Sequence, residues 1–391
     1  MATKSNSRTR SASSSSSAPP AKRQKITVAP FAATFPRRTL LSSSSWVNNV
    51  PFHVWTSKIL NPFLDLEALS TLGRCNTFFE EYWQYVLKLN IIRVPEGCPT
   101  VVAAMELAVV FSERNECTRE NPVKVQVGEG KHEIFYHITV DCNNVTIVGK
   151  GKGKTTILGG LHVNDKQNVK IQQLSAINIA GHGLVCLGSG SNVDVTECCF
   201  KKCQGNGMFV GAGATVTATR CDFMENSQCG MIVDDGATVT ATQCDFMENG
   251  DCGVECVGAN TKVRLNDSTM HHNFVYGLQA YGEGIFCGGA MLLKVSDSTM
   301  HHNGESGLQA YGHAVVNLHG TKTDIHSNES DGIEATRNAK VNIHLPSQHN
   351  TSHDNVGQNR VQEDGGSIAN INADGTFTHV EEVDNNEDDE E

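Results

Sequence analysis

Bulky aromatic side chains and long apolar runs are both scarce in this sequence of 391 residues. Phe, Trp and Tyr make up only 6% of the chain, whereas Gly occurs 36 times, which favours many turns and small packing units over a few large helices. The longest apolar run, residues 101–111, is interrupted by Glu106 and is too short to cross a bilayer. An apolar secretion signal is also missing behind the basic N-terminal residues. We therefore expect a nuclear or cytoplasmic protein that is not secreted and has no membrane partner.

Cysteine is plentiful, at 14 residues, but it lacks the spacing of a metal or redox motif. No Cys-x-x-Cys pair occurs, and none of the close groups lies at the histidine spacing of a zinc finger. A chain of this length does not need a disulfide scaffold, so we predict buried, reduced thiols and no cofactor. The close groups are Cys198, Cys199 and Cys203, and Cys252 with Cys256.

Acidic residues are missing from the N-terminal end of the chain, and basic residues are nearly missing from the C-terminal end. Residues 1–50 contain eight Lys or Arg and no acid, whereas residues 351–391 contain twelve acids and only Arg360 as a base. Ser-rich residues 1–45 have too few large apolar groups to offset their ordering entropy, so we predict that they are disordered, and residues 351–391 largely so. Nucleic acid is not expected as a partner. A candidate nuclear-import cluster, with a chance basic run as its alternative, consists of Lys22, Arg23 and Lys25.

Residues 46–92 carry apolar residues at helical spacing, which predicts three short helices. A unit of this size is marginal alone and is expected to pack on a partner or on the next domain. Thr100 can cap a further helix over residues 101–112, whose apolar stripe would cover the start of the following domain.

From about residue 123 to residue 345 the sequence repeats roughly every 24 residues. Residues 213–226 read GATVTATRCDFMEN and residues 236–249 read GATVTATQCDFMEN, an offset of 23. Apolar and polar residues alternate within each unit, which indicates strands. A unit this short cannot hold the four strands of a propeller blade. We predict short strands joined by turns, with one coil per repeat.

Two residue types recur at the repeat spacing and are expected to stack from coil to coil. Asparagine tolerates left-handed turns, and its amide can bond the next coil's asparagine and backbone. Cysteine at the same spacing is expected to act as a small buried apolar residue. The recurring residues are Asn226, Asn249, Asn273, Asn303 and Asn328, and Cys198, Cys221 and Cys244.

The first strands of the repeat region resemble a known family. Residues 123–131 (VKVQVGEGK) and 144–151 (NVTIVGKG), with the capping helix before them, are similar to the first coils of the pectin lyase-like right-handed β-helix superfamily. The resemblance covers about residues 97–350. It implies a mainly β protein, with a right-handed parallel β-helix of about nine coils at residues 93–350. An insertion near residues 282–289 is expected to loop out of the stack.

Residues 47–90 resemble an F-box. The pattern is carried by Val50-Pro51, an Ile-Leu pair, a Leu-Asp-Leu turn and the aromatic Phe79 and Trp83; Val50 replaces the usual Leu and Phe79 stands where Trp is common. The resemblance implies docking on the adaptor subunit of a cullin-RING ubiquitin ligase. A helical cap on the β-helix is the alternative. The adaptor-binding residues would be Pro51, Ile59, Leu60, Leu64 and Leu66.

Two segments resemble known catalytic or ligand-binding motifs, but each lacks residues that the motif requires. Residues 149–156 (GKGKGKTT) lack the first glycine of a phosphate loop, because position 148 is Val148. Residues 181–183 (GHG) resemble a motif of pectin-hydrolysing β-helix enzymes, which also need paired aspartates upstream and a later Arg-Ile-Lys; neither is present. We nominate no catalytic residue and predict that the protein is not an enzyme.

A histidine pair occurs twice, in DSTMHHN at residues 267–273 and again at residues 297–303. Stacked coils would place His271 near His301 and His272 near His302, which makes His271 and His301 weak candidates for a metal site. Because neighbouring residues of a strand face opposite ways, the four rings are not expected to converge.

These observations lead to a main functional prediction and two alternatives. The main prediction is a substrate-recognition subunit of a cullin-RING ligase, in which the F-box-like module binds the adaptor and the β-helix binds an unknown protein substrate. The alternatives are a carbohydrate-active β-helix enzyme, either a polysaccharide lyase or an epimerase, and a non-catalytic nuclear scaffold. Adaptor binding would favour the first, and release of unsaturated sugars the second.

Overall fold

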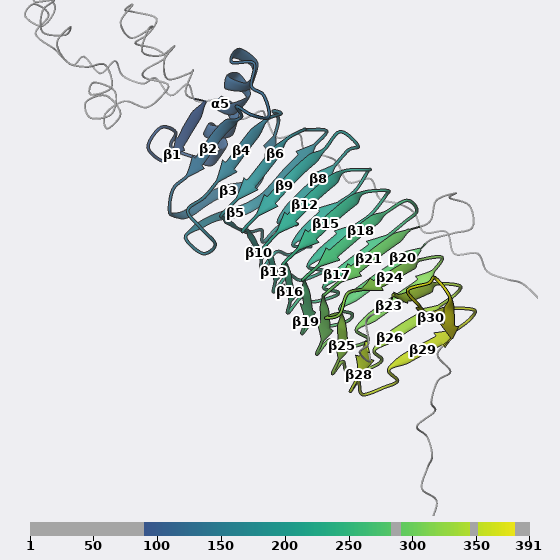
Figure 1. Cartoon of the computed structure of the whole chain (residues 1–391). Coiled ribbons are helices and arrows are strands. Elements are labelled where there is room, and N and C mark those ends of the chain that lie inside the picture. The colour runs from purple at the N-terminus through teal and green to yellow at the C-terminus, as the bar shows by residue number, and fades with distance from the viewer. Residues whose placement is uncertain (1–89, 283–290, 345–350, 380–391) are drawn as a thin grey trace, which may run out of the picture. The chain divides into compact units, whose positions relative to one another are not determined.

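Short strands with alternating apolar and polar residues lie parallel to one another, one coil above the next (Figure 1). The computed structural model describes residues 90–282, 291–344 and 351–379. These residues form the right-handed parallel β-helix that the sequence predicts, with about ten turns. Over the same ranges no helix combines the length and apolar character needed to cross a membrane.

The first sheet contains 13 strands, and successive coils add one strand after another to it as far as β30. All its pairings are parallel except the last, between β30 and β31. In order its strands are β1 (Ile91–Val94), β2 (Val123–Val127), β4 (Val145–Val148), β6 (Val169–Gln172), β9 (Asn192–Thr196), β12 (Thr215–Thr219), β15 (Thr238–Thr242), β18 (Lys262–Asn266), β21 (Leu292–Ser296), β24 (Val315–His319), β27 (Lys340–His344), β30 (Ser367–Ile371) and β31 (Phe377–His379).

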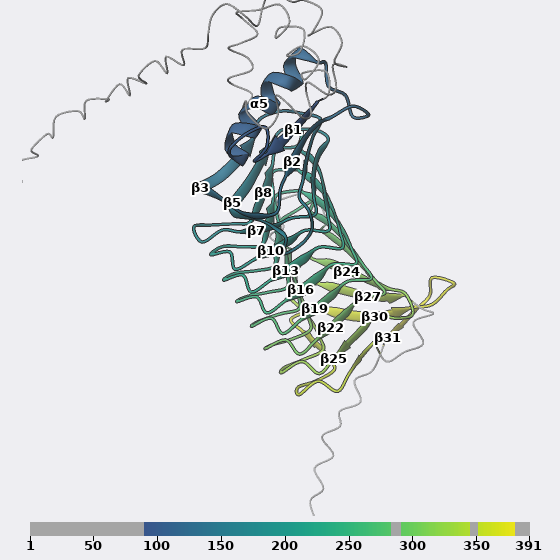
Figure 2. The same ribbon diagram turned by 90° about the vertical axis from the view of Figure 1, so that its left-hand side faces the viewer.

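The second sheet contains 18 strands in two ladders, which separate at β5 (Thr155–Asn164) because β5 pairs with both β7 and β8. Strand β3 (Gly130–Val140) pairs with β5 on its other edge. The β7–β28 ladder (Figure 2) contains β7 (Ser175–Ile177), β10 (Cys199–Lys201), β13 (Asp222–Met224), β16 (Asp245–Met247), β19 (Thr269–His271), β22 (Thr299–His301), β25 (Asp324–His326) and β28 (Ser352–His353). The β8–β29 ladder contains β8 (Leu184–Leu187), β11 (Met208–Val210), β14 (Met231–Val233), β17 (Val254–Val257), β20 (Leu278–Gly282), β23 (Leu308–Gly312), β26 (Ile333–Thr336) and β29 (Arg360–Glu363).

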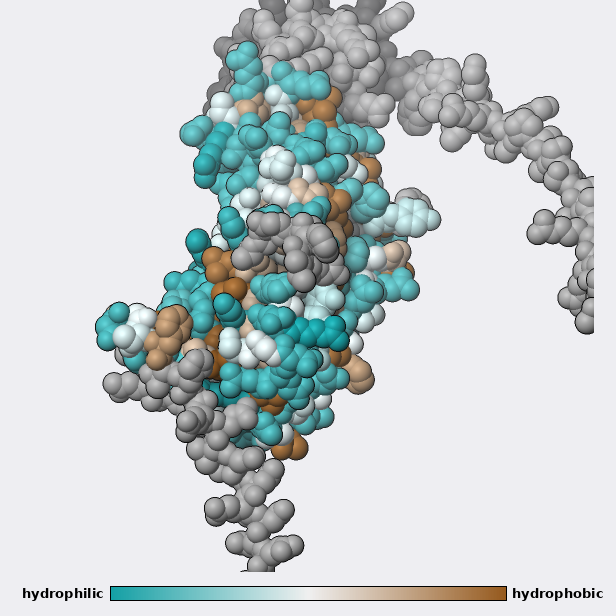
Figure 3. Space-filling model, turned by 90° about the vertical axis from the view of Figure 1, so that its right-hand side faces the viewer, coloured by the Kyte–Doolittle hydropathy of each residue, from teal (hydrophilic) through white to brown (hydrophobic). Residues whose placement is uncertain are grey.

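Apolar side chains of the strands fill the space inside the coils. Phe200, Phe223 and Phe246 occupy one inner column and are fully buried, with ring centroids 5.5 and 4.9 Å apart. The column continues through Met270 and Met300. The surface seen in Figure 3 is mainly hydrophilic, with only small apolar patches, as alternation along each strand requires.

Stacked asparagines, which we call the asparagine ladder, lie at the turns that connect the β7–β28 ladder to the β8–β29 ladder. Each asparagine donates its side-chain amide to the side-chain oxygen of the next, over 2.8–3.0 Å, and also to a strand carbonyl of the preceding coil, as from Asn249 to Phe223. This confirms the predicted stacking. Its members are Asn226, Asn249, Asn273, Asn303, Asn328 and Asn355.

Both ends of the stack differ from the sequence-based boundaries. Helix α5 (Val101–Arg114) is capped by Thr100, whose hydroxyl accepts from the Ala103 amide at 3.2 Å, and it buries Ala104, Ala108 and Phe111. Strand β1 pairs with β2, so the residues just before α5 belong to the first coil and not to the helical module predicted at residues 46–92.

At the other end, β28, β29, β30 and β31 continue the β-helix to residue 379. The predictions of a β-helix ending at residue 350 and of a largely disordered segment from residue 351 are therefore corrected. Pairing with earlier strands orders this segment despite its polar composition. The predicted F-box, import cluster, N-terminal tail and looped insertion lie outside the described residues, except for the ends of the F-box-like module and of the insertion.

Candidate active face

Histidines stack along the outside of the β7–β28 ladder. His271, His301, His326 and His353 occupy the same position in successive strands, with ring centroids 5.1–5.3 Å apart and planes within 8° of parallel. The first two of these belong to the histidine pair that repeats in the sequence. The last two were missed because His326 and His353 stand outside that motif.

The four histidines of the two pairs converge, contrary to the prediction that they would not. His272 and His302 have φ angles of +54° and +53°, so each lies in a left-handed bend rather than in an extended strand. The bend therefore places the His272 ring on the same side of the ladder as the His271 ring, and the His302 ring on the same side as the His301 ring. The Nδ1 atoms of His271 and His272 are 2.7 Å apart, and those of His301 and His302 are 2.8 Å apart.

Burial and repulsion by its neighbours keep His301, in this histidine row, neutral. Burial, and then the positive charge of His271, His326 and the flanking histidines, lowers the pKa of His301 to about 4. At the far end, a hydrogen bond to Asp354 raises the pKa of His353, and Asp324 lies 3.0 Å from its Nε2 atom. His301 is therefore held neutral, whereas His353 at the end of the row is prone to protonation.

A second row of polar side chains runs along the outside of the β8–β29 ladder. Glu255, Gln279, Gln309 and Glu334 occupy the same position in β17, β20, β23 and β26. The Gln279 amide donates to the Gln309 oxygen at 2.7 Å, and the Gln309 amide donates to Glu334 at 3.0 Å. We call this set the acid–amide row.

Tyr276 lies beside the acid–amide row, in the turn before β20. The Gln309 amide donates to its hydroxyl oxygen at 2.8 Å, and the exposed Glu305 lies close to the same hydroxyl. Burial, followed by this contact with Glu305, raises the pKa of Tyr276. Burial also raises the pKa of Glu334, which favours its protonated form. The turn thus brings together a phenol, a carboxylic acid that holds its proton more tightly than usual, and an exposed carboxyl group.

Two tyrosines form an aromatic surface next to these groups. Tyr281 and Tyr311 lie two residues after Gln279 and Gln309 in the same strands, so they share the outer face, and their ring centroids are 4.9 Å apart. The guanidinium carbon of Arg337 lies 4.8 Å from the centroid of the Tyr311 ring. The repeated LQAYG at residues 278–282 and 308–312 was the sequence signal for this surface, which the search for known motifs overlooked.

The two motifs rejected from the sequence have structural roles. The hydroxyl of Thr155 accepts from the Lys150 amide and donates to the Gly128 carbonyl, so residues 149–156 form a turn that leads into β5. His182 accepts a hydrogen bond from the backbone amide of Asn206 at 3.0 Å, and burial lowers its pKa. Both sets of contacts join neighbouring coils.

A family profile described as the right handed β-helix region matches residues 139–284. No curated protein sequence matches the chain. Among solved structures, the A-module of mannuronan C-5 epimerase AlgE4 of Azotobacter vinelandii is 15% identical with a TM-score of 0.49, over 70% of this chain and 91% of that one. The A-module of AlgE6 from the same organism is 16% identical with a TM-score of 0.46, over 69% and 88%. Pectate lyase Pel9A is 14% identical with a TM-score of 0.39, over 66% and 73%.

These comparisons contradict two predictions from the sequence: that the chain is a recognition subunit of a ubiquitin ligase and that it is not an enzyme. The solved structures with a similar β-helix are named as mannuronan C-5 epimerases and a pectate lyase. At 14–16% identity the likeness is one of fold, so the chemistry depends on this chain's own residues.

Proposed function

We propose that this chain is a carbohydrate-active β-helix enzyme that holds a polysaccharide against the outer face of β20, β23 and β26. One observation carries the proposal: two stacked tyrosines lie beside a hydrogen-bonded network that contains a half-buried glutamic acid and a half-buried phenol. Sugar rings present C–H faces that pack on aromatic rings, while their hydroxyl groups bond to amides and carboxyl groups.

The groups beside the tyrosines fit proton transfer to and from a sugar. Glu334, with its raised pKa, is suited to donate a proton to a leaving glycosidic oxygen. Tyr276 is held by Gln309 and lies beside Glu305, and a neutral phenol in this position can donate a hydrogen bond to developing negative charge. Cleavage or epimerisation of a glycosidic unit needs such a donor together with a base, and the exposed Glu305 is the candidate base.

The test offers the full chain three polysaccharides in parallel: polygalacturonate, alginate and a neutral glucan. Unsaturated products are followed by ultraviolet absorbance, chain cleavage by reducing ends, and epimerisation by proton NMR. We expect turnover of at least one, and a loss of about 100-fold or more in kcat for Glu334→Gln. Glu248→Gln changes an exposed residue in the bend after β16, beside the other ladder, and is the matched control, which should retain activity. A parent protein that neither binds nor converts any of the three polysaccharides would disprove the proposal.

A further inference from the structure

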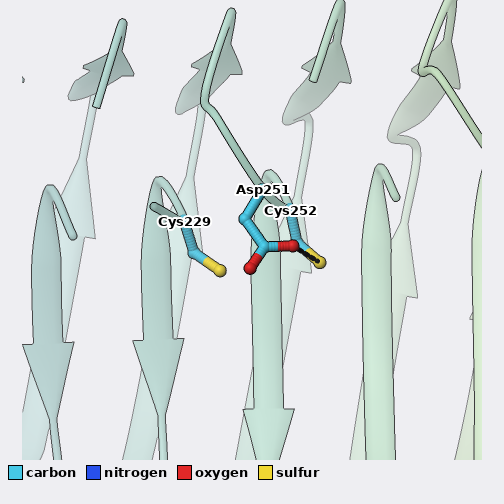
Figure 4. A group of neighbouring side chains, drawn as sticks. All are labelled: Cys229, Asp251 and Cys252. Atoms are coloured by element: carbon cyan, nitrogen blue, oxygen red, sulfur yellow. Dashed lines mark hydrogen bonds between the residues drawn. The ribbon is translucent and has the colours of Figure 1, made fainter. Parts of the chain in front are cut away.

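Two buried cysteines from neighbouring coils lie beside two carboxylates at the turns that precede β14 and β17. Cys229 and Cys252 occupy equivalent positions, as the hydrogen bond from the Gly230 amide to the Cys252 carbonyl shows. Each is 1% exposed. One ligand atom from each of Cys229, Asp251 and Cys252 can be chosen so that all lie within 4.8 Å of one another (Figure 4).

A further carboxylate contacts this group from β17, where Glu255 begins the acid–amide row. A Glu255 carboxylate oxygen is 3.3 Å from the Cys229 sulfur, and an Asp251 oxygen is 3.4 Å from the Cys252 sulfur. A tetrahedral zinc ion with bonds of about 2.3 Å to sulfur and about 2.0 Å to oxygen sets sulfur–oxygen edges of about 3.5 Å. Both observed separations match such an edge.

The charges of the group also favour a cation. Among the residues that the structure describes, no lysine or arginine forms an ion pair with Asp251 or Glu255. The contact with Cys229, and then burial, raises the pKa of Cys252, and burial raises the pKa of Glu255. A divalent ion would balance the negative charge that these groups avoid on their own.

Other stacked cysteines of the β-helix have different surroundings. Cys221 and Cys244 are also equivalent residues of neighbouring coils, but their thiols donate to the backbone carbonyls of Val195, Thr219, Ala218 and Thr242. Cys229 and Cys252 instead contact side-chain oxygens. Carboxylates therefore distinguish this pair from cysteines that serve only to fill the core.

We propose that Cys229, Cys252, Asp251 and Glu255 bind one soft or borderline divalent cation, such as Zn²⁺, in a tetrahedral site that links two coils. The site does not depend on the proposed sugar-processing function. Because the thiols must lose their protons to bind the ion, affinity should rise with pH. The ion would also fix the start of the acid–amide row, since the Cys252 sulfur lies 3.8 Å from the Gln279 side-chain oxygen.

The probe is Cd²⁺, whose bonds to thiolate give an ultraviolet charge-transfer band, added to the full chain after chelation and under reducing conditions. We expect one high-affinity ion that Zn²⁺ displaces. Cys252→Ser should weaken binding by at least 100-fold, and Asp251→Asn by about 10- to 100-fold. The control Cys221→Ser/Cys244→Ser should bind the ion as the parent does, because it removes two stacked thiols that lack carboxylate neighbours.

Asp251→Asn keeps both thiols and a side chain of the same size, so it tests the site even if Cys252→Ser fails to fold. Thermal unfolding gives an independent measure, because an ion that binds only the folded state should raise Tm in the parent and in the control. Absence of a high-affinity ion, equal binding by Asp251→Asn and the parent, or a Cys229–Cys252 disulfide that persists under reducing conditions would each overturn the proposal.

Discussion

Single residues in left-handed bends decide which side chains share a surface. The residue before each asparagine of the ladder has a positive φ angle although it is not glycine, as at Glu225, Glu248 and His302. Such a residue ends the strand and reverses the usual alternation of faces. In two coils this bend residue is a histidine, His272 or His302, and its ring lies beside the ring of the preceding histidine. The histidine row is therefore two rings wide in these two coils.

The neutral state of His301 predicts an acid-sensitive fold. Its pKa is about 4 in the folded chain against 6.5 for an ordinary histidine, so between these values the unfolded chain binds more protons. The free energy of unfolding should therefore fall as the pH is lowered from 6.5 to 4. His301→Gln should make this fall less steep, as measured by chemical denaturation at several pH values.

His313→Gln changes an exposed histidine outside the row and is the control, which should follow the parent. The dependence will not vanish in His301→Gln, because burial also lowers the pKa of His319 to about 4. Equal slopes for parent and His301→Gln would show that the row does not hold this histidine neutral.

Asn249 tests the value of one link in the asparagine ladder. Its amide donates to Asn273 and to the Phe223 carbonyl, and its oxygen accepts from Asn226. Asn249→Ala leaves these buried groups without a hydrogen-bond partner, and water cannot reach them to replace it. The free energy of unfolding should therefore fall by about 2–3 kcal/mol. Urea denaturation measures the loss. Asn192→Ala, at an exposed strand position, should change it by less than about 0.5 kcal/mol.

Strands of three to five residues are too short to be stable alone, and their stability comes from pairing and packing with the equivalent strands of neighbouring coils. Each inner side chain packs on its counterparts in the coils above and below, as Phe223 does between Phe200 and Phe246. A defect in one strand therefore disturbs three coils. The outer rows follow the same rule, which is why histidine packs on histidine and tyrosine on tyrosine.

Phe223→Ala removes the middle ring of the inner column and should destabilise the protein by about 3–5 kcal/mol, because the cavity is closed on both sides by rigid coils. Phe223→Leu should cost less, since it leaves a smaller void. Phe274→Ala is the control, as that ring is 75% exposed in a turn. Denaturant titration compares the three variants. Similar losses for Phe223→Ala and Phe274→Ala would contradict the packing argument.

The fold of the whole molecule was predictable because its signal is repeated in every coil. The asparagine spacing and the near-identical residues 213–226 and 236–249 each report one coil of the stack. The candidate face was not predictable from the sequence. Tyr276 and Glu334 come from different coils, and they lie close together only because of the length of each coil and the positions of the left-handed bends. The C-terminal boundary was missed since β29 has few apolar residues and is ordered by its pairing with β26.

We predict that the last strand, β31, prevents the β-helix from associating with other copies of the chain. Strand β31 pairs antiparallel with β30 and covers the final edge of the first sheet, where a parallel partner would otherwise add. A chain ending at residue 371 exposes the β30 edge and should form oligomers or aggregates, because unpaired strand edges bind one another. A chain ending at residue 379 keeps β31 and is the matched control, which should keep the parent's mass distribution. Light scattering during size-exclusion chromatography, over a range of concentrations, distinguishes them. If the shorter chain matched the control at every concentration, protection of this edge would have to come from the β-helix without β31.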